Sequence, residues 1–291
     1  MTQASVPQSS VEEAASHEAK FAPIVIEPSR GVSLRLQDLW EFRELLYFLF
    51  WRDLKVRYKQ TLLGGAWAIL QPLATTVIFT VVLGRLAKVS SDGVPYSLFA
   101  LSGLLPWQLF SFALTASSAS LVSNTQLITK VYFPRLIIPI SSVLVGLVDF
   151  AVGSTTLVAL MVYYRVVPTW GILILPLLIV FVIVTALSVG LILSALNVQY
   201  RDVRHAVPFL IQIWMFATPV VYPSSLVPAR WRVLYGLNPM AGVIDAFRWA
   251  LWGTRAGTGE VILASIGSVL ALLLIGVYYF RSVERNFADL A

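Results

Sequence analysis

Long apolar runs recur along most of this sequence, and they constrain its fold more than any other feature. The chain has 291 residues, of which 58% are hydrophobic and 12% are charged, and the charged share is about half that of a typical soluble domain. Runs of about 20 apolar residues are long enough to cross the ~30 Å hydrocarbon core of a bilayer as helices. Helices also satisfy their own backbone hydrogen bonds in lipid. The sequence therefore predicts an all-α integral membrane protein.

Six membrane-spanning helices are predicted. Their expected ranges are Ala66–Leu83, Leu98–Val122, Leu136–Tyr163, Ile172–Leu196, Ala206–Tyr222 and Val261–Phe280. If both termini are cytoplasmic, 14 of the 21 Lys and Arg residues fall on the cytoplasmic side of these spans. Positive charge concentrates on that side in membrane proteins, so the distribution predicts a multi-pass chain with both termini in the cytoplasm.

The chain before the first span divides into two predicted parts, followed by a transmembrane domain at residues 63–291. Residues 1–30 are rich in Ser, Ala, Glu and Pro and lack the apolar core of a signal peptide, which favours a disordered cytoplasmic tail. Residues 31–62 are predicted to contain an amphipathic helix. Its apolar run, Leu45–Trp51, is too short to span, so we expect it to lie in the cytoplasmic interface. Packing against a soluble partner is the alternative.

Between the last two spans, residues Pro223–Glu260 combine interfacial aromatic side chains with strong helix breakers. Pro228 and the pair Asn238-Pro239 prevent one continuous span. Two short re-entrant helices that dip into the outer leaflet would satisfy both features, because non-spanning backbone is tolerated where protein covers it. An amphipathic external loop is the alternative.

Few ionisable residues interrupt the predicted spans, and Asp149 is the most central of them. Gly146 and Gly153 flank it. Charge inside a membrane is costly and therefore marks functional candidates. The span interiors offer no second carboxylate, Lys or His for a proton relay, so we expect Asp149 to be a structural or pathway-facing residue instead of a proton carrier.

Aromatic residues make up 12% of the chain and gather in the second and fifth predicted spans. Aromatic belts at the membrane interfaces are the first interpretation. A sugar path is the second, because aromatic faces pack against the apolar faces of sugar rings. With Asp149, the candidate substrate-path residues are Trp107, Phe110, Phe112, Trp214, Phe216 and Tyr222.

Several classes of chemistry are excluded by composition. The chain has no Cys and only two His, His17 and His205, which argues against a metal cluster. No Gly-Lys pair is present, so a phosphate-binding loop is absent and any ATP must be hydrolysed by another chain. The net charge of +6 is attributed to membrane topology instead of nucleic-acid binding. Asp92, Asp202 and Asp245 are scattered over both sides, which argues against a membrane glycosyltransferase.

The segment Asn124–Arg135 connects the second and third spans on the predicted cytoplasmic side. It combines aromatic residues with two positive charges, and exposed aromatic side chains in a short loop indicate a docking surface for a protein partner. Topology signalling by the two cations is a compatible alternative. The candidate docking residues are Lys130, Val131, Tyr132, Phe133, Pro134 and Arg135.

Five stretches together resemble one known family. They are Leu63–Pro72, Ser102–Trp107, Lys130–Arg135, Asn197–Val203 and Leu237–Met240. In order and spacing they are similar to the type-2 ABC permeases that export O-antigen, capsule and teichoic-acid precursors, and the resemblance extends over roughly Leu39 to Arg281.

The resemblance implies a homodimer in the bacterial inner membrane bound to two copies of a nucleotide-binding ATPase subunit. That partner would hold ATP and Mg²⁺, and this chain would bind no cofactor. The expected substrate is an undecaprenyl-linked polysaccharide, with O-antigen preferred over capsule or teichoic acid; a drug or small-lipid exporter is the alternative. The loop matching Asn124–Arg135 is the ATPase-coupling helix in such families.

The predicted re-entrant segment is expected to form an outer gate in contact with membrane lipids. Arginines there are expected to face lipid headgroups or the pyrophosphate of the carrier, to which Arg offers paired donors. The candidate gate residues are Arg230, Trp231, Arg232, Asn238, Pro239, Arg248 and Trp249.

Overall fold

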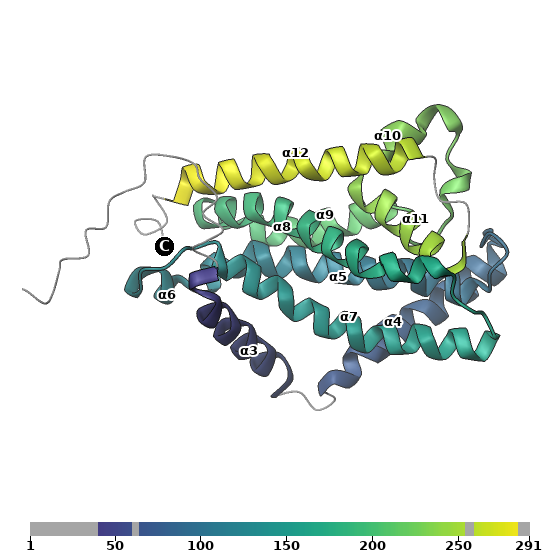
Figure 1. The fold of residues 1–291 in the computed structure, drawn as a ribbon, viewed down its shortest axis with the longest axis horizontal. Coiled ribbons are helices and arrows are strands. Elements are labelled where there is room, and N and C mark those ends of the chain that lie inside the picture. Colours follow the sequence, from purple (N-terminus) through teal and green to yellow (C-terminus); the bar gives the residue numbers. More distant parts are fainter. Residues whose placement is uncertain (1–39, 60–63, 254–258, 285–291) are drawn as a thin grey trace, which may run out of the picture. The chain divides into compact units, whose positions relative to one another are not determined.

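The computed structural model describes residues 40–59, 64–253 and 259–284, and the regular elements within these ranges are all helical (Figure 1). The predicted tail at residues 1–30 lies outside the described residues. Residues 31–39 and 60–62 of the predicted helical segment also lie outside the described residues.

In chain order, the elements are helices of very different length. They are α3 (Arg43–Lys59), a 3₁₀ turn (Gly64–Ala66), α4 (Trp67–Phe79) with a π-helical end (Thr80–Leu86), α5 (Tyr96–Ser123), α6 (Thr125–Lys130), α7 (Ile137–Tyr164), a 3₁₀ turn (Trp170–Ile174), α8 (Leu175–Gln199), α9 (Val203–Phe216), two 3₁₀ turns (Ser224–Leu226 and Ala229–Trp231), α10 (Arg232–Gly236), α11 (Pro239–Trp252) and α12 (Gly259–Glu284).

Five helical segments are long and apolar enough to cross a membrane. They are Gly64–Leu86, Tyr96–Ser123, Ile137–Tyr164, Trp170–Gln199 and Gly259–Glu284, and they match five of the six predicted spans.

The fifth predicted span, Ala206–Tyr222, is not confirmed. It overlaps α9, whose 14 residues extend only about 21 Å, short of the ~30 Å hydrocarbon core. The helix stops at Phe216, and Pro219 follows two residues after the cap residue Ala217. A proline ring obstructs helix continuation, so the rest of the predicted span, residues 217–222, forms turns and bends instead of helix.

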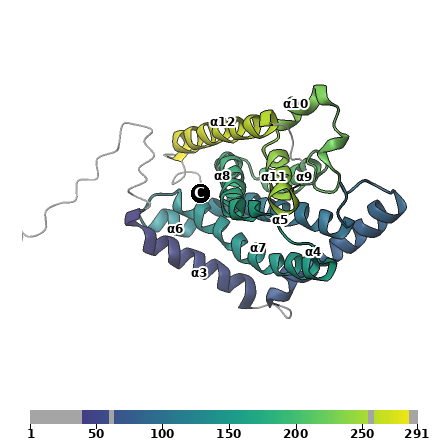
Figure 2. The same ribbon diagram turned by 45° about the vertical axis from the view of Figure 1, so that its right-hand side comes forward.

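Helix α5 forms the centre of the bundle and is buried along most of its length. It packs against α7 on one side and α8 on the other, with α4, α9 and α11 completing its surroundings. Helix α12 lies beyond α8, while α3 lies along α7 on the opposite side (Figures 1 and 2). A helix that is apolar on every face belongs in such a core.

One end of the bundle collects both ends of the described chain. Leu49 of α3, Ile128 of α6, Ile137 of α7 and Phe280 of α12 share one buried cluster there. The backbone carbonyl of Glu284, the last described residue, accepts a hydrogen bond from Arg135. The first and last described helices therefore meet at the same end as α6 (Figure 1).

The segment between α9 and α12 contains two short helices separated where the sequence predicts a break. Helix α10 ends at Gly236, and α11 begins at Pro239. The Asn238 side chain caps α11 by accepting a hydrogen bond from the Met240 amide at 3.2 Å. The helix break is confirmed, whereas the insertion of these helices into the outer leaflet stays a prediction.

Candidate functional site

A polar cavity of about 460 Å³ lies between α3, α4, α5 and α7. We call it the α3 cavity. Its polar lining residues are Arg57, Tyr58, Gln71, Gln108, Ser111, Thr115 and Asp149. Apolar side chains from the same helices complete the wall, among them Trp67, Leu105, Leu109, Phe112 and Phe150.

The α5 wall of this cavity follows from helical periodicity. Leu105, Gln108, Phe112 and Thr115 recur at three- and four-residue spacing, which places them on one face of the helix. The α7 wall depends on one glycine, Gly146. A β-carbon at Gly146 would come within 2.6 Å of the Phe112 ring, so only glycine lets this ring lie against α7.

Asp149 projects from α7 into this cavity and is paired with the end of α3. Its carboxylate lies 2.5 Å from the Arg57 guanidinium and also accepts a hydrogen bond from the Tyr58 hydroxyl. The Arg57 guanidinium in turn stacks over the Phe112 ring, 4.3 Å from its centroid. Two residues of the predicted substrate path, Asp149 and Phe112, thus meet in one site.

Burial raises the pKa of the Tyr58 phenol to about 12, and the adjacent Asp149 carboxylate adds to the shift. The phenol therefore stays protonated at neutral pH and acts as a hydrogen-bond donor to Asp149. The sequence gives no span residue to partner Asp149, because its partners belong to the helix that precedes the first span. The signal that could have found them is the Arg57-Tyr58 pair at the end of that helix.

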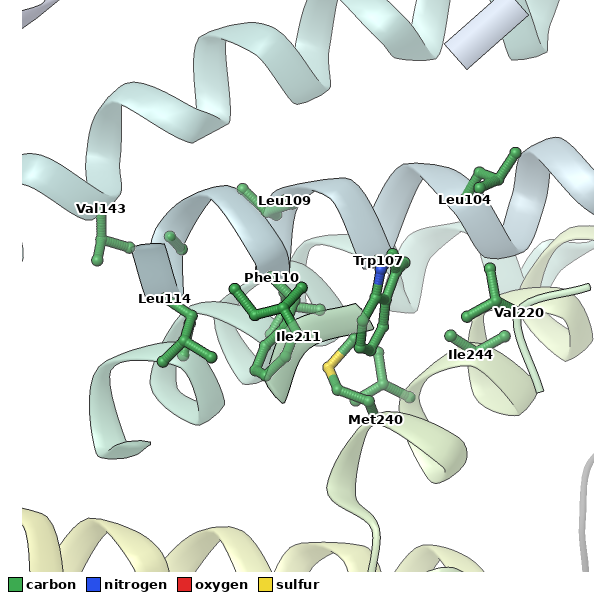
Figure 3. Packing of buried hydrophobic residues seen from close by; sticks show 14 of the residues in the cluster. Leu104, Trp107, Leu109, Phe110, Leu114, Val143, Ile211, Val220, Met240 and Ile244 are labelled. Atoms are coloured by element: carbon green, nitrogen blue, oxygen red, sulfur yellow. The ribbon is translucent and has the colours of Figure 1, made fainter. Parts of the chain in front are cut away.

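Trp107 and Phe110 do not belong to this cavity. Their side chains are 3% and 0% exposed in the core around α5, where Trp107 lies beside Met240 of α11 (Figure 3). Their ring centroids are 5.3 Å apart, and Trp214 of α9 packs on Phe110 at 5.0 Å. This burial contradicts the prediction that both residues line a path, and it follows from the central position of α5.

The other aromatic candidates lie near a second, more open hollow of about 350 Å³. Trp214, Trp231 and Tyr235 line it together with Asn238. The indole of Trp214 donates to the Asn238 side chain at 2.8 Å. Tyr222 and Phe216, the other two aromatic candidates, are linked to this hollow through Tyr235. The Tyr222 hydroxyl donates to the Phe216 carbonyl and lies 3.0 Å from the Tyr235 hydroxyl. Phe216 itself is exposed.

Arg248 is the clearest correction to the predicted gate. Its side chain is 4% exposed and does not face lipid headgroups. The guanidinium donates to the carbonyls of Pro219 and Val220 at 2.7 Å each and to that of Phe99 at 3.3 Å, while it stacks 3.6 Å over the Phe99 ring. Arg248 therefore binds the non-helical chain after α9 to the start of α5.

The remaining gate candidates are less buried. Arg230 lies over the Trp231 ring at 5.8 Å, and Arg232 donates to the Val227 carbonyl at 3.3 Å. Trp231 and Trp249 are 50% and 40% exposed, whereas Pro239 is buried at the start of α11. Contact of these exposed residues with headgroups stays a prediction.

The predicted docking loop has one member that faces inward. Lys130, Val131 and Tyr132 are exposed, with Tyr132 at 77%. Phe133 is only 5% exposed and belongs to the buried cluster at this end of the bundle. This burial contradicts its assignment to a partner surface. Of the other two members, Pro134 is partly buried, and the Arg135 side chain binds the Glu284 carbonyl.

These features together define the class of protein. Within the described residues, the chain has five membrane-length helical segments, one of which, α5, is the buried centre of the bundle. A polar cavity lies within the bundle. An exposed loop with basic and aromatic residues lies at the same end as α3 and the end of α12. This architecture is that of a polytopic membrane transport protein.

The family is set by the sequence comparisons. The model for the ABC-2 type transporter family matches residues 44–252, and the chain belongs to this family. RfbA of Myxococcus xanthus, named an O-antigen export system permease protein, is 30% identical over 87% of this chain and 98% of its own. A protein of the same name from Klebsiella pneumoniae is 30% identical over 85% of this chain and 95% of its own. KpsM of Escherichia coli, named a polysialic acid transport protein, is 23% identical over 81% and 92%.

Proposed function

We propose that this chain is the membrane-spanning subunit of an ABC exporter that carries a lipid-linked polysaccharide, with O-antigen preferred, across the bacterial inner membrane. The observation that carries the proposal is the similarity to permeases named for O-antigen export over nearly the whole length of both chains. Capsule and teichoic-acid precursors are the closest alternative substrates, and the polysialic acid transporter is a more distant relative.

ATP hydrolysis belongs to a partner in this proposal. The sequence has no phosphate-binding loop, so ATP and Mg²⁺ are held by a separate nucleotide-binding subunit and this chain binds no cofactor. Helix α6 and the exposed residues Lys130, Val131 and Tyr132 are the proposed docking surface. The Arg52 side chain supports this loop from α3 by donating to Asn124 at 2.7 Å.

The membrane orientation follows from the same loop. If α6 contacts a cytoplasmic ATPase, the start of α3 and the end of α12 lie on the cytoplasmic side, because all three share one end of the bundle. The distribution of Lys and Arg supports this orientation.

Two copies of the chain form the proposed transporter. Exposed apolar side chains cover α4 and α9, including Val77 and Ile78 on α4 and Phe209 and Ile213 on α9. Such faces are buried by lipid or by a second copy in a membrane. The open hollow near Trp214 and Trp231 is the proposed outer part of the glycan path.

Deletion of the gene from its native bacterium tests the function. We expect surface polysaccharide to disappear while lipid-linked glycan accumulates at the cytoplasmic face, and the wild-type gene should restore export. The control is the same deletion complemented with the chain and an ATPase partner whose phosphate-binding lysine is replaced. Unchanged surface polysaccharide, together with altered export of drugs or small lipids, would establish the alternative class.

A further inference from the structure

We propose that the α3 cavity binds a neutral sugar ring of the lipid-linked glycan, held between the Asp149–Arg57 pair, the side-chain amide of Gln108 and the rings of Trp67 and Phe112. The inference rests on the proposed export function, because it names the part of the substrate that this cavity takes. It is carried by the cavity's volume, its hydrogen-bonding groups, its net charge and its position.

The hydrogen-bonding groups of the cavity suit a polyol. Gln71 and Gln108 line it, and within residues 40–59, 64–253 and 259–284 neither side-chain amide has a hydrogen-bonding partner. An amide offers both donors and acceptors, as a sugar hydroxyl requires. The Asp149 carboxylate retains acceptor capacity beyond its two contacts, and the Arg57 guanidinium retains donors beyond the one on Asp149.

The charge of the cavity favours a neutral ligand over an anion. Arg57 and Asp149 lie 2.5 Å apart, so their charges cancel locally. A phosphate that approached Arg57 would also meet the Asp149 carboxylate, and two anions at that separation repel strongly in a low-dielectric site. Hydroxyl groups bridge such a pair without this cost.

The apolar wall gives the ring a surface on which to stack. Trp67 of α4 and Phe112 of α5 both line the cavity, and aromatic faces pack against apolar faces of other rings. A volume of about 460 Å³ falls within the ~300–1,000 Å³ range of small-molecule sites, which accommodates a sugar unit.

The position of the cavity suits a headgroup whose tail remains in lipid. Asp149 is 12 residues beyond Ile137, which places it about 18 Å along the 28-residue helix α7. The last turn of α3 therefore reaches the middle of a membrane-length helix. Next to the cavity, α4 exposes Trp67 and Leu70, an apolar surface along which a lipid chain can lie.

Background-free thiol labelling tests the site, because the chain contains no Cys. The full chain carrying Ser111→Cys, which lines the cavity, is placed in phosphatidylcholine nanodiscs. The discs contain dodecyl maltoside, dodecyl octaethylene glycol ether or dodecyl phosphate at equal mole fraction. The matched control is Ser123→Cys, an exposed position on the same helix outside the cavity. We expect the maltoside alone to slow maleimide labelling at position 111, by about threefold when it is present at twice its dissociation constant.

A second variant separates binding from folding. Gln108→Met preserves side-chain length and the Asp149 pair. In the Ser111→Cys background it should abolish protection by the maltoside, and in the Ser123→Cys background it should leave labelling unchanged. Equal protection by all three amphiphiles, or stronger protection by dodecyl phosphate, overturns the inference. If protection fails while the gene still supports surface polysaccharide, the sugar site is refuted and the export function stands. If protection holds while deletion leaves surface polysaccharide unchanged, the export function is refuted instead.

Discussion

Replacing Arg248 with Met should strongly destabilise this chain. The guanidinium donates three hydrogen bonds to backbone carbonyls, two of them in the non-helical stretch Thr218–Tyr222. Hydrogen bonds from charged groups contribute about 1.5–3 kcal/mol each, although such values do not add fully. Met fills similar volume but leaves these carbonyls without their donor. We therefore expect a loss of about 3–5 kcal/mol, at the upper end of single-substitution effects.

Thermal unfolding in nanodiscs, followed by tryptophan fluorescence, measures this loss. With about 2–4 °C per kcal/mol for a chain of this size, the midpoint should fall by roughly 10 °C. Arg230→Met is the matched control, because Arg230 is exposed in the same segment and its replacement should change stability by less than about 0.5 kcal/mol. The unfolding midpoint of Arg248→Lys should lie between those of the two Met variants. An ammonium keeps the charge but lacks the planar, forked donors that let a guanidinium bond all three carbonyls. Equal midpoints for Arg248→Met and Arg230→Met would refute the assignment.

Three further outcomes are expected. The purified chain alone should show no ATP turnover, since it lacks a phosphate-binding loop; turnover in a preparation free of partner ATPase would contradict this. Gly276→Ala should lower the unfolding midpoint at a cost of about 1–3 kcal/mol, because a β-carbon there overlaps the Ser188 carbonyl, whereas Gly267→Ala on the same helix meets open space and should be neutral or stabilising. Phe133→Ala should cost about 3–5 kcal/mol of stability, whereas Tyr132→Ala should preserve the fold and weaken co-purification of the ATPase subunit; equal stability losses would contradict the inward and outward assignments.

The apolar runs predict most of the helices because lipid demands an apolar surface over a whole span. The predicted span Leu136–Tyr163 differs from α7 by one residue at each end, and Ile172–Leu196 lies inside the segment Trp170–Gln199. The fifth predicted span is helical only as far as Phe216, and the reason is tertiary. The carbonyls of Pro219 and Val220 are outside a helix yet buried, and they are satisfied by Arg248 from a later part of the chain. Hydropathy cannot detect such a remote donor.

Adjacent aromatic residues in the docking loop illustrate a second limit of prediction from sequence. Tyr132 and Phe133 are consecutive residues outside any helix, after α6 ends at Lys130. Phe133 faces the bundle while Tyr132 faces outward. The sequence shows that the pair is unusual, but only the packing of α3, α7 and α12 determines that Phe133 is the buried member.

The candidate substrate-path residues of α5 lie in two different environments for a related reason. Trp107 and Phe112 are five residues apart on α5, so they lie on different faces of the helix. Because α5 is largely apolar around its circumference, periodicity gives no preferred face, and both residues are equally good candidates by sequence. The distinction comes from the neighbours: α9 and α11 bury Trp107, while the end of α3 brings Arg57 to Phe112 and Asp149. A charged residue in an apolar span thus indicates a site, because burying it in the membrane costs free energy. Its partners can be identified only from the packing of a helix that lies outside the spans.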